Sequence, residues 1–464
     1  MLLGRWDVAP TGMPLSQRLS APQLFVGSFV LLILAGTLVL RLTPGLYTGA
    51  GLGWLDSLFT ATSAVCVTGL IVEDTATYFT FAGQAVILAL IQLGGLGMIA
   101  FTSIIIVSLG QRVSLRQTGV AANAVAVVPN LSEEQLLGNV VKFTFLLEAI
   151  GAVLLYLLWG PRMGWGEAAW PALFHSVSAF CNAGFSTFTT SLVPFSHDPL
   201  TLLVVSALIV IGGLGFVTLA DAAYRRSQAR AGRQVRLSLH TRMVVATTAT
   251  LLIGGFFAFT LLEWERTLVS MPWYHRIING LFMSVTCRTA GFNTIDYAQA
   301  NPNTNFLTIL FMGIGGSPGS TAGGIKTTTF FLIGLLAWSR LRGRQIPQVW
   351  DRSIPEETTQ RAIGLFVAYF GVVTLGIFLL TLTEPSGDES FSFLPHMFEA
   401  ASAVNTVGLS MGPTAHLSSP GKLVIIGLMF LGRVGPLTFA AALALRVRQR
   451  PGRFRYAYED VVVG

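Results

Sequence analysis

The sequence predicts an all-α membrane protein with four parallel membrane, pore loop, membrane repeats around a pseudo-fourfold pore axis. Two observations lead to this fold class. The 464-residue chain is 52% hydrophobic and only 11% charged, whereas a soluble domain has about 25% charged residues. A short string ending in glycine also recurs four times, at separations of 115, 107 and 117 residues.

Eight apolar runs reach the roughly 20 residues that a transmembrane helix needs. They lie near 24–42, 80–109, 140–159, 199–220, 242–262, 305–338, 364–382 and 421–445. Basic residues crowd into alternate loops, so the positive-inside rule places both termini in the cytoplasm. These residues are Arg112 and Arg116; Arg225, Arg226, Arg230, Arg233 and Arg236; Arg340, Arg342 and Arg344; and Arg446, Arg448, Arg450, Arg453 and Arg455.

Several function classes are excluded by composition. No soluble segment is large enough for an enzyme, and the basic residues are not interleaved with aromatic residues as in a nucleic-acid-binding protein. The N-terminus lacks the apolar h-region of a cleaved signal peptide, so the first span should remain as an anchor. Cys66, Cys181 and Cys287 lie inside the repeated strings without histidine at ligand spacing. We interpret them as buried packing residues rather than as a metal site.

The four strings define the repeats. They read LFTATSAVCVTGL at 58–70, LFHSVSAFCNAGF at 173–185, LFMSVTCRTAGF at 281–292 and MFEAASAVNTVGL at 397–409. A period of this length holds one span, a short helix with a loop, and a second span. The expected units are 1–110, 111–235, 236–350 with an intramembrane gate loop, and 351–464 with a cytoplasmic tail. Each contains two spans, so all four enter the bilayer in the same sense.

Each string should form part of a cation filter. The dozen helical residues before each glycine are too few to cross a bilayer, and the carboxyl end of such a half-helix favours a cation. Glycine permits the positive φ that turns carbonyls toward an axis, and carbonyl rings can replace the hydration shell of K⁺. The alternative is that small residues only let re-entrant helices pack. The predicted filter residues are Val67, Thr68, Gly69, Asn182, Ala183, Gly184, Thr289, Ala290, Gly291, Thr406, Val407 and Gly408.

The returning spans also align, as QLGGLGMIAF at 92–101, VIGGLGFVTL at 210–219, MGIGGSPGSTAGGIKTTTF at 312–330 and FLGRVGPLTF at 430–439. In the first two, the glycines suggest close helix packing. The third contains one proline and five glycines between residues 315 and 324, which cannot continue a helix. We therefore expect a gate loop under the filter, made of Gly315, Gly316, Ser317, Pro318, Gly319, Ser320, Thr321, Ala322, Gly323, Gly324 and Lys326.

Arg433 replaces the second glycine in the fourth returning span. It lies 11 residues from Lys422 and 13 from Arg446, roughly 16 and 20 Å along a helix, which is too deep for easy snorkelling. Burying it costs at least about 2.5 to 3.5 kcal/mol. It should therefore face the aqueous path or cap loop carbonyls, as an electrostatic barrier to cations. The alternative is a structural pair with a buried acid such as Glu148.

Three weaker patterns complete the sequence analysis. The string GSTAGGIKT resembles a phosphate-binding loop, but counting from Gly319 puts Ile325 where the lysine must stand, so nucleotide binding is excluded. Arg288 and Glu399 are expected to pair behind the filter if the third and fourth repeats are neighbours. Asp56 could favour the positive end of the first pore helix or attract cations at the mouth.

Together these strings, with GGSPGSTAGGIKT and GRVGP, resemble the Trk/Ktr/HKT superfamily of potassium transporters over essentially the whole chain. Eight spans and a short tail ending YEDVVVG are more similar to the KtrB-type subunit than to the longer Trk type. The resemblance implies a homodimer with one pore per subunit and cytosolic nucleotide-binding regulatory subunits of the KtrA or TrkA kind. It also implies the filter role for Gly69, Gly184, Gly291 and Gly408, the gate role for 315–326 and the barrier role for Arg433.

The predicted function is potassium uptake across a bacterial inner membrane, by channel-like conduction. K⁺ is the transported ion, Na⁺ is a candidate modulator, and membrane lipid is the other expected partner. Because each repeat keeps a single filter glycine, the potassium-over-sodium selectivity stays open. The alternatives are a sodium-preferring member of the superfamily, an alternating-access secondary cation transporter, and a membrane sensor that conducts nothing.

Overall fold

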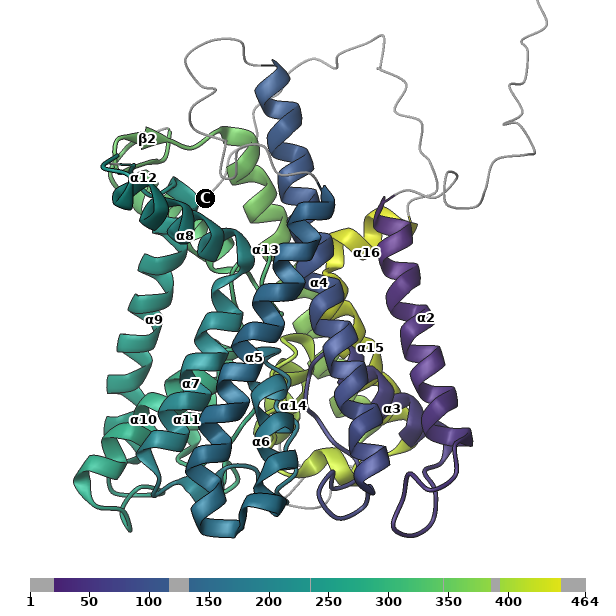
Figure 1. The fold of residues 1–464 in the computed structure, drawn as a ribbon. Coiled ribbons are helices and arrows are strands. Elements are labelled where there is room, and N and C mark those ends of the chain that lie inside the picture. The colour runs from purple at the N-terminus through teal and green to yellow at the C-terminus, as the bar shows by residue number, and fades with distance from the viewer. Residues whose placement is uncertain (1–20, 117–132, 234, 345, 385–392, 444–464) are drawn as a thin grey trace, which may run out of the picture.

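The computed structural model describes residues 21–116, 133–233, 235–344, 346–384 and 393–443, which are mostly helical (Figure 1). The all-α fold class is confirmed. The cytoplasmic tail predicted from the sequence lies outside these residues. The helices are α2 (Ala21–Leu42), α3 (Trp54–Val65), α4 (Phe81–Arg116), α5 (Glu133–Met163), α6 (Trp165–Phe180), α7 (Pro199–Leu214), α8 (Phe216–Arg230), α9 (Leu239–Glu263), α10 (Trp273–Thr286), α11 (Pro302–Met312), α12 (Thr327–Leu341), α13 (Glu356–Thr383), α14 (Phe393–Val404), α15 (Ser419–Val434) and α16 (Pro436–Leu443).

Small elements connect these helices. Two single 3₁₀ turns, η2 (Val193–Phe195) and η4 (Pro413–His416), follow the second and fourth pore strings. The strands β1 (Gln348–Val349) and β2 (Arg352–Ser353) form a two-stranded antiparallel hairpin between α12 and α13.

The membrane-crossing helices match the apolar runs of the sequence. By length and composition, α2, α4, α5, α9 and α13 can each span a membrane, and the bent pair α7 and α8 makes a sixth candidate in the described chain. The remaining two apolar runs are divided between shorter helices, α11 with α12 and α15 with α16. Every apolar run thus corresponds to helix, but three of the four returning spans are interrupted.

Two of the returning spans, in the second and fourth repeats, are interrupted at a glycine whose backbone is left-handed. Gly215 has a φ of 81° and Gly435 has a φ of 86°, a region that side chains with a Cβ rarely adopt. The helix axis turns by 95° between α7 and α8, and at the second break Pro436 begins α16. The apolar run at 199–220 is therefore not one straight helix, although its composition suggested a single span.

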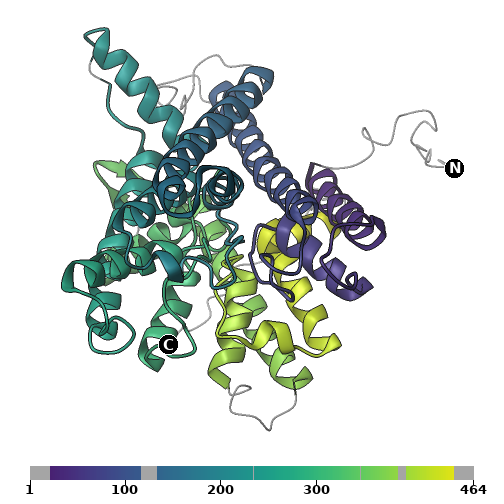
Figure 2. The ribbon, with the colours of Figure 1, turned by 60° about the horizontal axis from the view of Figure 1, so that its bottom comes forward.

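The four pore helices α3, α6, α10 and α14 lie in the same half of the molecule, away from α8, α12 and α16 (Figure 1). Each packs against the returning helix of the preceding repeat: α6 against α4, α10 against α7, α14 against α11, and α3 against α15. The last contact joins the fourth repeat to the first, so the order is cyclic. Figure 2 shows the same closure, because the chain colours run around a common centre.

The pore helices form the interior of the molecule. Nine of the 12 residues of α14 are buried, whereas the spanning helices expose large apolar side chains on their outer faces, including Leu31, Leu261 and Leu382. An apolar outer surface is what lipid acyl chains contact. The spanning helices, whose apolar outer faces suit contact with lipid, therefore surround the pore helices and their strings at the centre.

Candidate functional site: a glycine ring above an intramembrane loop

The four glycine strings share one unusual backbone conformation. In every repeat, both the glycine and the residue two positions before it have positive φ, a region that costs a residue other than glycine about 1 to 3 kcal/mol. The φ values are 93° at Gly69, 70° at Gly184, 81° at Gly291 and 92° at Gly408, and 56° at Val67, 59° at Asn182, 71° at Thr289 and 49° at Thr406. Because the same strained positions recur in all four repeats, the four strings follow the same backbone path.

The strings also close into a ring. A Cβ added to each glycine would collide with the carbonyl oxygen that precedes the glycine of the next repeat. The pairs are Gly69 with Ala183, Gly184 with Ala290, Gly291 with Val407, and Gly408 with Thr68. The fourth contact returns to the first repeat, so the predicted filter residues lie together around one axis.

Hydroxyl side chains from the pore helices hold each string. Ser63 Oγ accepts from Gly69 N at 3.1 Å, and Ser402 Oγ accepts from Gly408 N at 3.0 Å. Ser178 Oγ donates to Phe185 O at 2.7 Å, and Thr286 Oγ1 donates to Phe292 O. The third string is one residue shorter than the others, so its hydroxyl comes five rather than six residues before the glycine. The shorter third string keeps the same kind of support, because Thr286 of α10 bonds the residue after its glycine as Ser178 of α6 does.

The three cysteines lie at the ends of pore helices. Cys66, Cys181 and Cys287 are the C-cap residues of α3, α6 and α10, and all three are buried free thiols. Cys181 Sγ lies 3.8 Å from the Glu148 carboxyl. Among the described residues, no group of three or more His, Cys, Asp or Glu side chains is placed to hold a metal ion.

Residues 313–326 form a non-helical segment between α11 and α12, as the glycines and the proline predicted. On one side, the segment contacts the second repeat: Ser317 N donates to Gly213 O at 2.9 Å, and Thr321 Oγ1 donates to Phe180 O at 3.2 Å. On the other side it contacts the fourth repeat, where a Cβ on Gly323 would meet Thr406 Oγ1. The loop is therefore packed directly against the ring.

Arg433 connects this loop to the first repeat. Its side chain is fully buried, Nη1 donates to Thr321 O, and Nη2 donates to Gly94 O at 3.1 Å. The arginine thus caps one loop carbonyl, that of Thr321, in agreement with one of the two expectations from the sequence, and also bonds a carbonyl of α4. The alternative pair with Glu148 is not among the ion pairs of the described residues, and that carboxylate accepts from Gln92 Nε2 at 3.0 Å.

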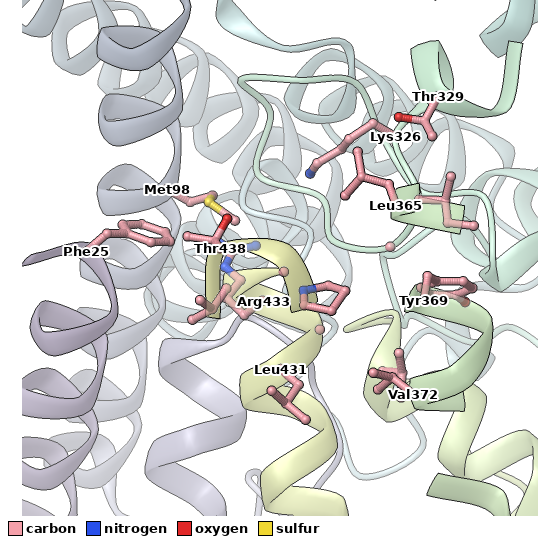
Figure 3. A pocket seen from close by; sticks show the side chains of 17 residues that line it. Phe25, Met98, Lys326, Thr329, Leu365, Tyr369, Val372, Leu431, Arg433 and Thr438 are labelled. Atoms are coloured by element: carbon pink, nitrogen blue, oxygen red, sulfur yellow. The ribbon is translucent and has the colours of Figure 1, made fainter. Parts of the chain in front are cut away.

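A second cation lies close to Arg433. Figure 3 shows Lys326 and Arg433 on the wall of one cavity of about 230 Å³, between the loop, α13 and α15. Lys326 Nζ donates to Ala322 O at 2.7 Å and so braces the loop from within. Two basic side chains therefore lie on the side of the ring that carries the loop.

A family model described as "TrkH: Cation transport protein" matches residues 23–450. The chain belongs to the TrkH family. Transport rather than enzymatic catalysis is therefore its class of activity, and the resemblance to Trk/Ktr proteins is confirmed.

Curated relatives cover nearly the whole chain. "Potassium/sodium uptake protein NtpJ" of Enterococcus hirae is 37% identical over 97% of this chain and 98% of its own length. "Ktr system potassium uptake protein B" of Vibrio alginolyticus is also 37% identical, over 96% of this chain and 95% of its own length. The crystal structure of the potassium transporter TrkH from Vibrio parahaemolyticus superposes with a TM-score of 0.73 at 21% identity, over 93% of this chain and 86% of that one. That likeness shows a shared fold.

One predicted charge pair is wrong for this TrkH-family chain. Arg288 and Glu399 do not pair: Arg288 Nη2 donates to Gly315 O at 2.9 Å, so the arginine supports the loop. Asp56 lies in the first turn of α3, as the first of its two predicted roles requires, and its ion pair with Lys422 at 2.7 Å disfavours the second role, attraction of cations at the mouth. Gly315 and Lys422 are remote in sequence from Arg288 and Asp56, so local sequence patterns did not indicate these contacts.

Glu399 instead braces the segment that follows its own glycine. Its carboxylate accepts from Ser410 Oγ, from Met411 N at 3.1 Å and from Thr414 Oγ1. In the second repeat the equivalent helix position is His175, whose Nε2 lies 2.9 Å from Ser186 Oγ. The corresponding positions of the first and third repeats are Thr60 and Met283. Long polar side chains therefore brace two diagonally opposite strings of the TrkH-family ring.

One carboxylate at the ring was missed by the sequence analysis. Asp74 follows the first ring glycine by five residues and lines a cavity on the face of the ring opposite the loop. A lone aspartate in a loop carries no periodic signal. Only its position after a pore string could have indicated it.

Proposed function

We propose that this chain is the membrane subunit of a potassium uptake system and conducts K⁺ channel-like through the glycine ring. The observation that carries the proposal is the closed ring of four strings, each with the same two left-handed positions. The names of the relatives support K⁺ as the transported ion.

In this proposal, backbone carbonyls of the ring replace the hydration shell of K⁺. The candidate residues are the three that end each string, from Val67, Asn182, Thr289 and Thr406 to the ring glycines. The carboxyl ends of α3, α6, α10 and α14 point at the strings and add a favourable negative potential. Four short re-entrant helices are tolerated at membrane depth because they are buried in protein.

The loop at 313–326 is the proposed gate. Arg433 has two proposed roles: its hydrogen bonds hold the loop closed, and its positive charge opposes the passage of cations. The guanidinium bonds to Thr321 and Gly94 hold the loop against the first repeat. A fixed positive charge at this depth also opposes a passing cation. Displacing the loop would break the bond to Thr321 O, whereas the bond to Gly94 O joins Arg433 to α4 and does not involve the loop.

We place the chain in the bacterial inner membrane with both termini in the cytoplasm. Arg225, Arg233 and Arg236 surround the end of α8, on the side away from the pore helices (Figure 1), which supports a cytoplasmic position for that side. We further propose a homodimer bound to nucleotide-binding regulatory subunits, as the resemblance of the sequence implies; relatives named as protein B of a Ktr system support the view that the chain is one part of a larger system. The four repeats, divided near 110, 235 and 350, are the proposed units.

Rubidium tracer uptake into liposomes that hold this chain alone tests the function. Uptake that potassium blocks far more strongly than sodium is the expected result. Equal competition would favour the second candidate, a sodium-permeable transporter, which the single glycine per string and the relative named "Potassium/sodium uptake protein" support. Absence of uptake, with and without added regulatory subunits, would contradict both.

A further inference from the structure

The face of the glycine ring opposite the gate loop opens into a cavity of about 230 Å³. All four ring glycines line it, together with the hydroxyl groups of Ser186 and Ser410. Among its lining residues, Asp74 is the one ionisable side chain. A cation that leaves bulk solvent for the ring from this face passes the Asp74 carboxylate.

The carboxylate is held in place by its own repeat and by the second repeat. Its Oδ2 atom accepts from Thr77 Oγ1 and from Thr189 Oγ1, each at 2.8 Å, and its Oδ1 atom accepts from Ala76 N at 3.1 Å. Thr189 follows the second ring glycine, so this bond bridges two pore strings. The carboxylate is therefore positioned before any cation arrives.

The loop around Asp74 is also anchored to the first repeat. Tyr78 N donates to Asp74 O at 3.0 Å, and Thr80 N donates to Leu46 O at 2.9 Å. Rigid support of this kind lowers the entropy cost of binding a ligand.

The charge of Asp74 is not neutralised within the part of the chain that the structure describes. The ion pairs found there join Arg162 with Asp198, Arg361 with Glu357, and Lys422 with Asp56. All the groups that bond Asp74 are neutral donors, which hold a carboxylate without cancelling its charge. An unpaired negative charge in a cavity with low-dielectric walls raises the local concentration of cations.

We propose that Asp74 forms a recruitment site for hydrated monovalent cations at the entrance of the glycine ring. The site precedes the carbonyl filter, and neutral oxygens of the cavity wall share the hydration shell of the ion. Because the site acts through charge rather than through direct selection, it raises the rate of cation arrival and leaves the maximal rate to the filter and gate. This inference rests on the proposed function.

The test measures radioactive rubidium uptake by cells that lack their own potassium uptake systems. Wild type, Asp74→Asn, Asp74→Glu and Glu73→Gln are compared at an ionic strength of about 0.01 M, where the Debye length is about 30 Å. Glu73 is the matched control, because it is the adjacent acid, is exposed and does not line the cavity. Uptake is measured again with choline chloride at about 1 M, where the Debye length is about 3 Å.

Asp74→Asn is expected to raise the half-saturating rubidium concentration about three- to fivefold at low ionic strength, with the maximal rate retained. The shift should shrink at high ionic strength, Asp74→Glu should restore the wild-type value, and Glu73→Gln should leave it unchanged. Equal shifts in the Asp74 and Glu73 variants would overturn the site, since general surface charge would then explain them. A reduced maximal rate with an unchanged half-saturating concentration would also overturn it.

A binding measurement separates this inference from the proposed function. Rubidium should raise the melting temperature of purified wild-type protein at lower concentrations than it does for Asp74→Asn. If wild-type cells take up no rubidium, the proposed function fails and the melting comparison still decides whether Asp74 recruits the cation. Identical rubidium dependence in both proteins would reject the site.

Discussion

At the scale of single residues, the ring depends on positions where a side chain does not fit. Gly184 has a positive φ, and a Cβ there would lie 2.9 Å from Ala290 O. By contrast, Gly254 in α9 has open space around the position of a Cβ. Two glycine-to-alanine changes in one chain can therefore have opposite consequences.

We expect Gly184→Ala to abolish rubidium uptake and to lower stability by about 1 to 3 kcal/mol. Gly254→Ala should transport normally and be as stable as wild type or up to about 1 kcal/mol more stable, because alanine favours helix. Tracer uptake and thermal melting measure the two effects. Normal selective uptake by a well-folded Gly184→Ala protein would reject the filter role of the ring.

Arg433 combines a charge with two specific hydrogen bonds, and substitutions can separate them. Arg433→Met removes both and leaves the buried Thr321 carbonyl of the loop without this donor, at a cost of about 1 to 3 kcal/mol, whereas Gly94 lies inside α4 and its carbonyl keeps the helical backbone donor. Arg433→Lys keeps the charge, but a single ammonium does not reproduce the fork geometry of a guanidinium.

We expect Arg433→Met to raise rubidium flux several-fold in liposomes without any partner. Arg433→Lys should stay near wild-type flux if the charge is the barrier, and should match Arg433→Met if the two bonds latch the loop. Unchanged flux in both folded variants would show that the gate lies elsewhere. Lys422→Met is the control, because that lysine pairs with Asp56 away from the loop.

At the scale of elements, the interrupted third returning span is the feature that differs from a simple helical repeat. The two ends of the loop already lie side by side: Gly315 N donates to Ile325 O at 3.0 Å, and Ile325 N donates to Gly313 O at 3.2 Å. Removing the residues between these ends therefore demands little movement of α11 or α12.

Deletion of residues 317–324 should give a folded protein with higher partner-independent rubidium flux, because the segment packed beneath the ring is lost. The control is Thr321→Ala, which removes the hydroxyl bond to Phe180 O but keeps the carbonyl that Arg433 uses. Flux in that variant should remain near the wild-type level. A deletion variant that melts like wild type but gains no flux would contradict the gate.

At the scale of the whole molecule, one central site is shared by all four repeats. The ring draws on residues from 67 to 408, and each pore helix packs on the preceding repeat. A cation bound in the ring would therefore stabilise the entire fold rather than one repeat.

Potassium should accordingly raise the melting temperature of the purified protein relative to choline at equal ionic strength. The stabilisation should approach about 2.7 kcal/mol at a concentration 100 times the dissociation constant. Gly184→Ala should lose the potassium dependence, and Gly254→Ala should keep it. A melting temperature that responds equally to potassium and choline would indicate that no selective site forms in the isolated chain.

Features that depend on local backbone chemistry could be predicted from the sequence. Apolar runs of membrane length, glycines where φ is positive, and a loop too rich in glycine to be helical all act within a few residues, so the sequence strings were enough to predict the ring and the non-helical loop. The partners of the charged groups could be found only from the tertiary contacts. Arg288 supports the loop, Glu399 braces its own string, and Asp74 faces the ring cavity. Charges act on whatever lies near them in space, and neighbours in this molecule are as far apart as Asp56 and Lys422.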